Sequence, residues 1–250
     1  MNQQIANNTY AFLIMTNIIT LVFLVIISFR YRVPQKVLKK LGIIDLHVLK
    51  IYPLYSINNI ISLTYDRDNF DIVMVGDSIT NAGRWNEIFN NRKVANLGIN
   101  GDSTDGVLNR LVDIYYLNPK KCFLMIGIND FQGNRSIEYV IQNYKRIIQE
   151  LKQHNIKIIV QSILHLGHNY YINHIGGKNK TNWKTINKKV EKTNIELEKI
   201  AVEYGVEFID INTKLSVNNV LEEKYGDSSG LHLSQLGYEE WAEIIKPLIE

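Results

Sequence analysis

The sequence predicts an α/β domain, in which helices cover both faces of a parallel sheet, preceded by one transmembrane helix. Three observations lead to this prediction. From residue 70 onward, short apolar runs alternate with longer amphipathic stretches, which is the pattern of a parallel sheet with crossover helices. Most of the short runs are apolar throughout, as expected for strands that are buried on both faces. Near the N-terminus, residues 10–29 contain no charged side chain and are long enough to cross the hydrocarbon core of a membrane.

The N-terminal segment is predicted to be an uncleaved membrane anchor, residues 1–29. It contains the run YAFLIMTNIITLVFLVIISF, and no Asp, Glu, Lys, Arg or His precedes residue 30. A secretory signal peptide would carry a basic start and a small-residue cleavage site. Here MNQQIANNT has no basic side chain and SFRYR offers no cleavage site. A buried core helix is the alternative interpretation.

A basic segment and linker follow the anchor, over residues 30–69. The whole chain has a formal net charge of +3, but residues 30–50 alone carry +5 and residues 51–250 carry −2. The positive-inside rule therefore places the domain that follows on the cytoplasmic side of the membrane, and the basic cluster can also bind anionic lipid headgroups. Since the rest of the chain has no basic excess, nucleic-acid binding is not expected.

The folded domain is predicted over residues 70–250. Its five strands are expected at 71–76, 93–98, 121–127, 157–164 and 206–211. Its five helices are expected at 80–90, 104–117, 136–154, 184–204 and 234–249, with apolar residues at three- and four-residue steps that are clearest in the third. The only cysteine, Cys122, lies in a predicted strand and is expected to be a buried apolar side chain. No feature of the sequence indicates an oligomeric state.

Polar motifs stand where the first three strands end and near the C-terminus. They are GDSIT at 76–80, NLGINGDST at 96–104, GIND at 127–130 and GLHLSQLGY at 230–238. In open α/β sheets, ligands bind outside the carboxyl ends of the strands. The residues of these motifs are therefore the candidates for a functional site.

These motifs hold the groups that acyl transfer requires. Ser78 supplies a hydroxyl at a strand-to-helix turn, where the start of a helix also favours negative charge. Gly101 offers an unobstructed backbone N–H and Asn129 an uncharged side-chain donor for an oxyanion, and His232 offers an imidazole suited to general-base work. Taken alone, each has a structural explanation: Ser78 as a helix cap, the glycines as turn residues, Asn129 as a loop cap and His232 as a half-buried histidine. Gly98 is interpreted as structural, and Asp130 is expected to bond neighbouring loop amides.

The four motifs together resemble those of the SGNH hydrolases, also called GDSL esterases and lipases. The likeness is greatest to the branch of platelet-activating-factor acetylhydrolases and bacterial acyl esterases, and it covers residues 70–249. It implies a flavodoxin-like three-layer α/β/α sandwich, hydrolysis of carboxylic esters, and neither a metal nor an organic cofactor. It assigns the nucleophile to Ser78, the oxyanion donors to Ser78, Gly101 and Asn129, and the catalytic histidine to His232.

One position departs from the family pattern. The family usually carries an aspartate three residues before the histidine, where this chain has Ser229. Such an aspartate orients the imidazole and stabilises its charged form. Asp227 and Ser229 are both candidates for this third role; a backbone carbonyl, or a Ser–His dyad without a third member, is the alternative.

The resulting prediction is a membrane-anchored serine esterase that cleaves short-chain acyl esters of a glycan or lipid. Two alternatives stay open: an O-acyltransferase that uses the same site, and a catalytically silent domain that binds a glycan or a protein partner. Ser229 is the feature that favours the silent domain. The complete set of serine, glycine, asparagine and histidine argues against it.

A loop rich in histidine follows the fourth predicted strand. Its three histidines, at 165, 168 and 174, do not have the spacing of a zinc site, so no metal is expected. The loop also carries aromatic and amide side chains that suit a sugar or acyl pocket, unless it is only a surface excursion. These are Tyr170, Tyr171, Asn173 and Trp183.

Overall fold

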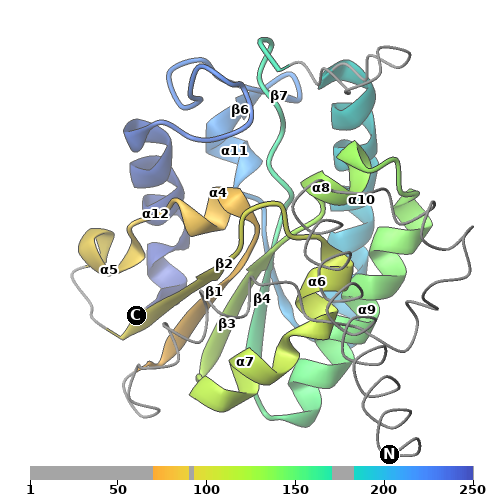
Figure 1. Cartoon of the computed structure of the whole chain (residues 1–250), viewed down its shortest axis with the longest axis vertical. Coiled ribbons are helices and arrows are strands. Elements are labelled where there is room, and N and C mark those ends of the chain that lie inside the picture. Colours follow the sequence, from red (N-terminus) through yellow and green to blue (C-terminus); the bar gives the residue numbers. More distant parts are fainter. Residues whose placement is uncertain (1–69, 90–92, 171–182, 250) are drawn as a thin grey trace, which may run out of the picture. The chain divides into compact units, whose positions relative to one another are not determined.

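The computed structural model describes residues 70–89, 93–170 and 183–249, which form a three-layer α/β/α sandwich (Figure 1). Five parallel strands make the central sheet, in the order β2-β1-β3-β4-β5. This is the order of flavodoxin-like doubly wound sheets, so the predicted α/β domain and all five of its strands are confirmed. The strands are β1 (Ile72–Gly76), β2 (Val94–Gly98), β3 (Lys121–Met125), β4 (Lys157–Gln161) and β5 (Glu207–Ile209).

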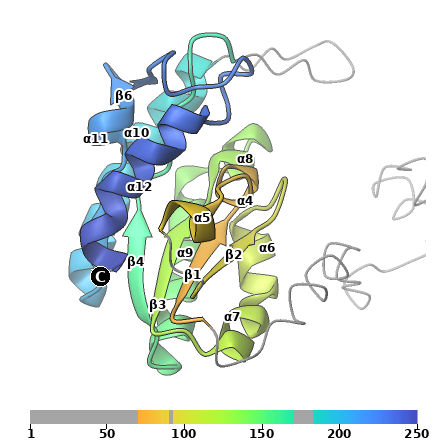
Figure 2. The same ribbon diagram turned by 90° about the vertical axis from the view of Figure 1, so that its left-hand side faces the viewer.

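Helices cover the two faces of the sheet, as Figures 1 and 2 show. One face carries α4 (Ser78–Asn81), α5 (Trp85–Ile88) and α12 (Gln235–Ile249), with α5 packed against α12. The other face carries α6 (Thr104–Asn109), α7 (Leu111–Leu117), α9 (Ile137–Gln153) and α10 (Trp183–Tyr204), with α9 packed against the other three. The short elements are α8 (Ile128–Gln132), α11 (Asn212–Leu215), and the pair β6 (Ser216–Val217) and β7 (Val220–Leu221).

Two predicted helices are each broken into two, which corrects the sequence-based prediction. In the stretch 80–90, the indole of Trp85 lies directly over Gly83, where a Cβ would come within 2.4 Å of it. The Trp85 Nε1 donates to the Thr80 carbonyl at 2.9 Å, so the chain turns between α4 and α5. In the stretch 104–117, α6 ends at Arg110, whose φ is −125°. The reason is the inward course of the Arg110 side chain, described below.

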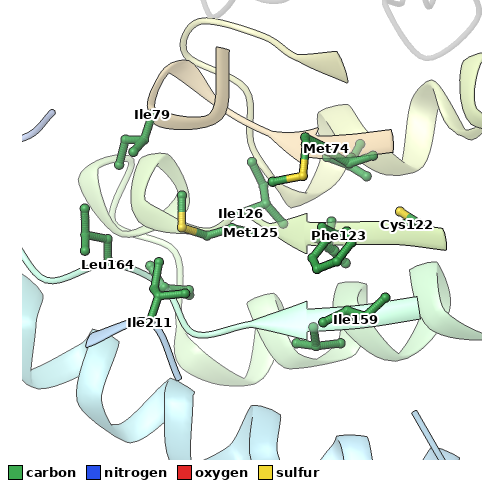
Figure 3. Close-up of a cluster of buried hydrophobic side chains, with 14 of the residues drawn as sticks. Met74, Ile79, Cys122, Phe123, Met125, Ile126, Ile159, Leu164 and Ile211 are labelled. Atoms are coloured by element: carbon green, nitrogen blue, oxygen red, sulfur yellow. The ribbon is translucent and has the colours of Figure 1, made fainter. Parts of the chain in front are cut away.

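The core is built from the strands and from the inner faces of the helices. Figure 3 shows Met74 of β1, Phe123 of β3 and Ile159 of β4 side by side along neighbouring strands, and all three are fully buried. Cys122 is buried as predicted, and burial raises the pKa of its thiol to about 12. It is therefore an inert apolar side chain at neutral pH.

The predicted anchor, residues 1–29, and the basic segment, residues 30–69, lie outside the described part of the chain. Among the helices within residues 70–89, 93–170 and 183–249, none has the length and apolar character to cross a membrane.

Candidate active site

Ser78 is the first residue of α4, directly after the end of β1. Asp77 precedes it as the helix N-cap, and its carboxylate accepts a hydrogen bond from the Ile79 N–H at 2.9 Å. The cap of α4 is therefore Asp77, and the structural explanation of Ser78 as a helix cap is wrong. Gly76 permits this tight turn, because a Cβ there would lie 2.1 Å from the Thr80 hydroxyl.

The structure brings Ser78 into contact with His232, which is 154 residues away in the sequence. The Ser78 Oγ lies 2.9 Å from the His232 Nε2. His232 lies in the loop before α12, and its side chain is about a third exposed (32%). A hydroxyl within hydrogen-bond reach of an imidazole is the arrangement of a nucleophile and its base.

Asp227 faces the other ring nitrogen of His232. Its Oδ2 lies 3.8 Å from the Nδ1, which is too long for a hydrogen bond but within ion-pair distance. Ser229 holds the opposite carboxylate oxygen, since both its N–H and its hydroxyl donate to the Asp227 Oδ1. Of the two candidates for the third member, Asp227 is thus beside the imidazole, whereas Ser229 is bound to Asp227.

The two other predicted oxyanion donors lie on the neighbouring strand ends, because β1 pairs with both β2 and β3. Gly101 has a φ of +75°, and a Cβ there would meet nothing within 4 Å. Within the described residues its N–H has no hydrogen-bond acceptor. Asn129, at the start of α8, donates from its Nδ2 to the Asp102 carbonyl at 2.8 Å. An amide nitrogen has two hydrogens, so one of them stays available to a ligand.

The structural interpretations of Gly98 and Asp130 are confirmed. A Cβ at Gly98 would lie 2.2 Å from the Asn81 N, so this glycine lets α4 pack closely on the end of β2. The buried carboxylate of Asp130 accepts from the Thr104 N–H at 3.0 Å and from the Thr104 hydroxyl at 2.7 Å. These two bonds fasten the start of α6 to α8.

Sequence reasoning missed a buried ion pair behind the oxyanion donors. The Arg110 Nε lies 2.8 Å from the Asp102 Oδ2. Arg110 also donates from its Nη2 to the Gly76 carbonyl at 3.1 Å. A signal was present in the sequence, because Arg110 stands at helical spacing from the buried residues Val107 and Ile114. A charge on an apolar helix face indicates a buried partner.

The histidine-rich loop has a mainly structural role in the part that is described. The ring of His165 is buried, burial lowers its pKa, and neither of its nitrogens has a hydrogen-bond partner among the residues that the structure describes. His168 packs edge-on against Trp183, with 4.9 Å between ring centroids. Tyr170 is buried and belongs to the hydrophobic core. The remaining loop residues of the prediction, at positions 171, 173 and 174, lie outside the described residues.

A groove of about 420 Å³ lies between α5 and the start of α12. Ala82, Leu233 and Tyr238 form part of its wall, and Leu233 directly follows His232. Four polar side chains also line it: Arg84, Glu87, Gln235 and Glu239. Its volume is within the range of small-molecule pockets, roughly 300–1,000 Å³.

The loop that carries His232 depends on Gly230. Its φ is +67°, and a Cβ there would lie 2.8 Å from the Tyr170 N. Gly205 has a similar φ of +62° with open space around it, so Gly205→Ala is a matched control for backbone strain alone. We expect Gly230→Ala to destabilise the protein by about 1–3 kcal/mol more than Gly205→Ala and to lower kcat roughly 10-fold or more, by moving His232. Urea unfolding and esterase assays measure both effects, and equal effects of the two substitutions would contradict the expectation.

Burial raises the pKa of Asp77 from 3.8 to about 7, and the nearby Asp102 and Asp130 carboxylates add to the rise. The folded state therefore holds this proton more tightly than the unfolded state. Stability is lost as the pH rises from about 4 to about 7, by at most about 1.4 kcal/mol per pH unit. Asn also caps helices well, so the stability of Asp77→Asn relative to the wild type is expected to rise between about pH 4 and about pH 7. Denaturant titrations across this range test it, and a stability difference that does not change with pH would disprove it.

The chain matches known proteins in both family and fold. The model of the GDSL-like lipase/acylhydrolase family matches residues 74–240. A protein from Streptococcus pneumonia, provisionally described as a platelet activating factor, is 26% identical, with 73% of this chain and 85% of that chain covered and a TM-score of 0.62. A GDSL-like lipase from Bacteroides thetaiotaomicron is 21% identical over 78% of this chain and 96% of that chain, with a TM-score of 0.66. An acetyl xylan esterase is 21% identical over 72% of this chain and 99% of that chain, with a TM-score of 0.56. No curated protein matches.

Proposed function

The chain belongs to the GDSL-like lipase/acylhydrolase family and is an ester hydrolase, and from this premise we propose that it is a serine esterase whose nucleophile is Ser78. The observation that carries the proposal is the 2.9 Å contact between the Ser78 Oγ and the His232 Nε2. Asp227 is proposed as the third member of the triad, because its carboxylate faces the His232 Nδ1. The aspartate has thus moved two residues towards the N-terminus from its usual position in the family, and Ser229 at that usual position orients it.

The proposed reaction has two steps. His232 takes the proton of the Ser78 hydroxyl while the Ser78 Oγ attacks the ester carbonyl carbon. The N–H groups of Ser78 and Gly101 and the Nδ2 of Asn129 stabilise the oxyanion. His232 then gives its proton to the departing alcohol, which leaves an acyl-enzyme on Ser78. Water attacks that ester with His232 again as the base. The bond between the acyl carbon and the Ser78 Oγ then breaks, His232 returns the proton to the Oγ, and the acid is released. Throughout, Asp227 stabilises the protonated imidazole.

The substrate is proposed to be a short acyl ester of a hydroxyl-rich alcohol, such as a glycan. A groove of small-molecule size is lined by Leu233, the residue that follows His232, and its polar side chains, among them Glu87 and Gln235, suit an alcohol part that carries hydroxyl groups. A structural neighbour described as an acetyl xylan esterase has the same fold. Esters of a lipid are the second possibility, which substrates of increasing acyl length distinguish.

The experiment is a hydrolysis assay on the full-length chain, purified in detergent. p-Nitrophenyl acetate, butyrate and octanoate are compared with an acetylated sugar, and the released acid is measured. Turnover that falls with acyl length, with free acid as the product, supports the proposal. Preference for the octanoate would favour a lipid ester. Acyl product that appears only when a sugar acceptor is added would show an O-acyltransferase.

We also propose that residues 10–29 anchor the protein in a membrane, with the esterase domain on the cytoplasmic side. The uncharged segment and the basic residues that follow it support this. The orientation is tested by fusing two reporters, one at a time, to the C-terminus. One reporter is active only in the cytoplasm, and the other is active only outside it. Activity of the outside reporter would reverse the orientation, and release of the protein by alkaline carbonate would rule out the anchor.

A further inference from the structure

A buried ion pair connects the segments that carry all three proposed oxyanion donors. The side chains of Arg110 and Asp102 are 6% and 9% exposed, and the Nε–Oδ2 distance is 2.8 Å. A buried ion pair contributes little net stability, because desolvation offsets the attraction between its charges. Its hydrogen bonds to the surrounding main chain therefore point to a role in local geometry.

Each donor is tied to this pair through a short path. The Gly76 carbonyl, two residues before Ser78, accepts from the Arg110 Nη2 at 3.1 Å. The same carbonyl accepts from the Ile99 N–H at 3.1 Å, which joins the end of β1 to the loop that holds Gly101. Asp102 directly follows Gly101, and its own carbonyl accepts from the Asn129 Nδ2 at 2.8 Å.

Neighbouring residues leave space for the Arg110–Asp102 pair and bind it. At Gly106, a Cβ would lie 1.6 Å from the Asp102 Oδ1, so only glycine leaves room for that carboxylate. The Ser103 N–H donates to the same oxygen at 2.9 Å. Arg110 is the C-cap of α6, and its guanidinium lies against the Asp102 carboxylate. A planar guanidinium can reach the Asp102 carboxylate and the Gly76 carbonyl at once, whereas the ammonium of a lysine acts as a point charge.

We propose that Arg110 and Asp102 are positioning residues that hold the three oxyanion donors in their mutual arrangement. This inference rests on the proposed function of Ser78. Neither side chain touches the substrate. Their effect is transmitted by the Gly76 carbonyl and by the main chain at Asp102, and it is exerted on the transition state more than on the bound substrate.

The test uses Arg110→Gln, Asp102→Asn and the double variant in the full-length chain. We expect kcat for p-nitrophenyl acetate to fall about 100-fold, comparable to the loss of one oxyanion donor, while KM changes by less than about threefold. Because the two residues act as one unit, the double variant is expected to be no slower than the slower single variant. Leu151→Ala is the control for lost stability: Leu151 is fully buried at the end of α9, and its substitution should lower the Tm and leave kcat unchanged.

A fluorophosphonate probe supplies a readout that needs no natural substrate. The Ser78 Oγ forms a bond to phosphorus, the P–F bond breaks, fluoride leaves and His232 receives the proton, while the phosphonyl oxygen occupies the oxyanion position. We expect the labelling rate of Arg110→Gln to fall by about the same factor as its kcat. Labelling of Arg110→Gln at the wild-type rate would overturn the inference and leave the proposed function intact. A wild-type chain that is not labelled at Ser78 would overturn the proposed function, and this inference with it.

Discussion

Replacing Ser78 by alanine is expected to lower kcat/KM for p-nitrophenyl acetate by at least about 10,000-fold, because no other group can form the acyl-enzyme. The fold should survive, since the Ser78 side chain contacts only His232 among the described hydrogen bonds and the cap of α4 is supplied by Asp77. Initial rates and urea unfolding of the purified variant measure the two effects.

Ser136→Ala is the matched control for this experiment. Ser136 accepts from the Tyr139 N–H at 3.2 Å as the N-cap of α9, so its loss should cost about 1 kcal/mol of stability and leave the rate unchanged. A Ser78→Ala variant that keeps a tenth or more of the wild-type rate would mean that the serine is only the first residue of a helix. A water molecule activated by His232 would then be the nucleophile.

Replacing Asp227 by asparagine is expected to lower kcat by roughly 1,000-fold. Asparagine keeps the size of the side chain but removes the charge that stabilises protonated His232, and it can favour the wrong imidazole tautomer. Ser229→Ala should lower kcat only about tenfold. The substitution removes one charge-assisted hydrogen bond to Asp227, but the backbone N–H of residue 229 still donates to the Asp227 Oδ1, at 2.9 Å in the wild type. Steady-state kinetics of both variants give the comparison.

The ranking of these two variants decides which residue is the third member. A larger loss for Ser229→Ala than for Asp227→Asn would assign the role to Ser229. No loss for either variant would leave a Ser–His dyad.

The sheet could be predicted from the sequence because its signal is local. A strand buried on both faces is apolar throughout, and β1 and β3 were recognisable in this way from their apolar runs. The broken helices could not be predicted, because their causes are tertiary. One break depends on Trp85 packing over Gly83, and the other on a guanidinium that finds its partner at Asp102.

The candidate site was located from motifs whose residues are distant in the sequence, and the structure places Ser78 and His232 in contact. The sequence could not decide which residue faces the His232 Nδ1, because this depends on the shape of one loop. An antiparallel bridge joins Gly226 to Leu233, and Gly230 turns with a φ of +67°. This fold of the loop brings Asp227 beside a histidine five residues later. The family pattern pointed to the position three residues before the histidine, where Ser229 stands, and left Asp227 and Ser229 both as candidates.

The most direct test of the account is to identify the residue that becomes acylated during turnover. The full-length wild type and the Asp227→Asn variant are mixed with p-nitrophenyl acetate, quenched in acid within seconds, digested and mapped by mass spectrometry. The account predicts an acetyl group on Ser78 in both, and none anywhere in Ser78→Ala. Turnover without an acetylated Ser78, or an acetyl group on a different side chain that forms and decays at the rate of turnover, would contradict it.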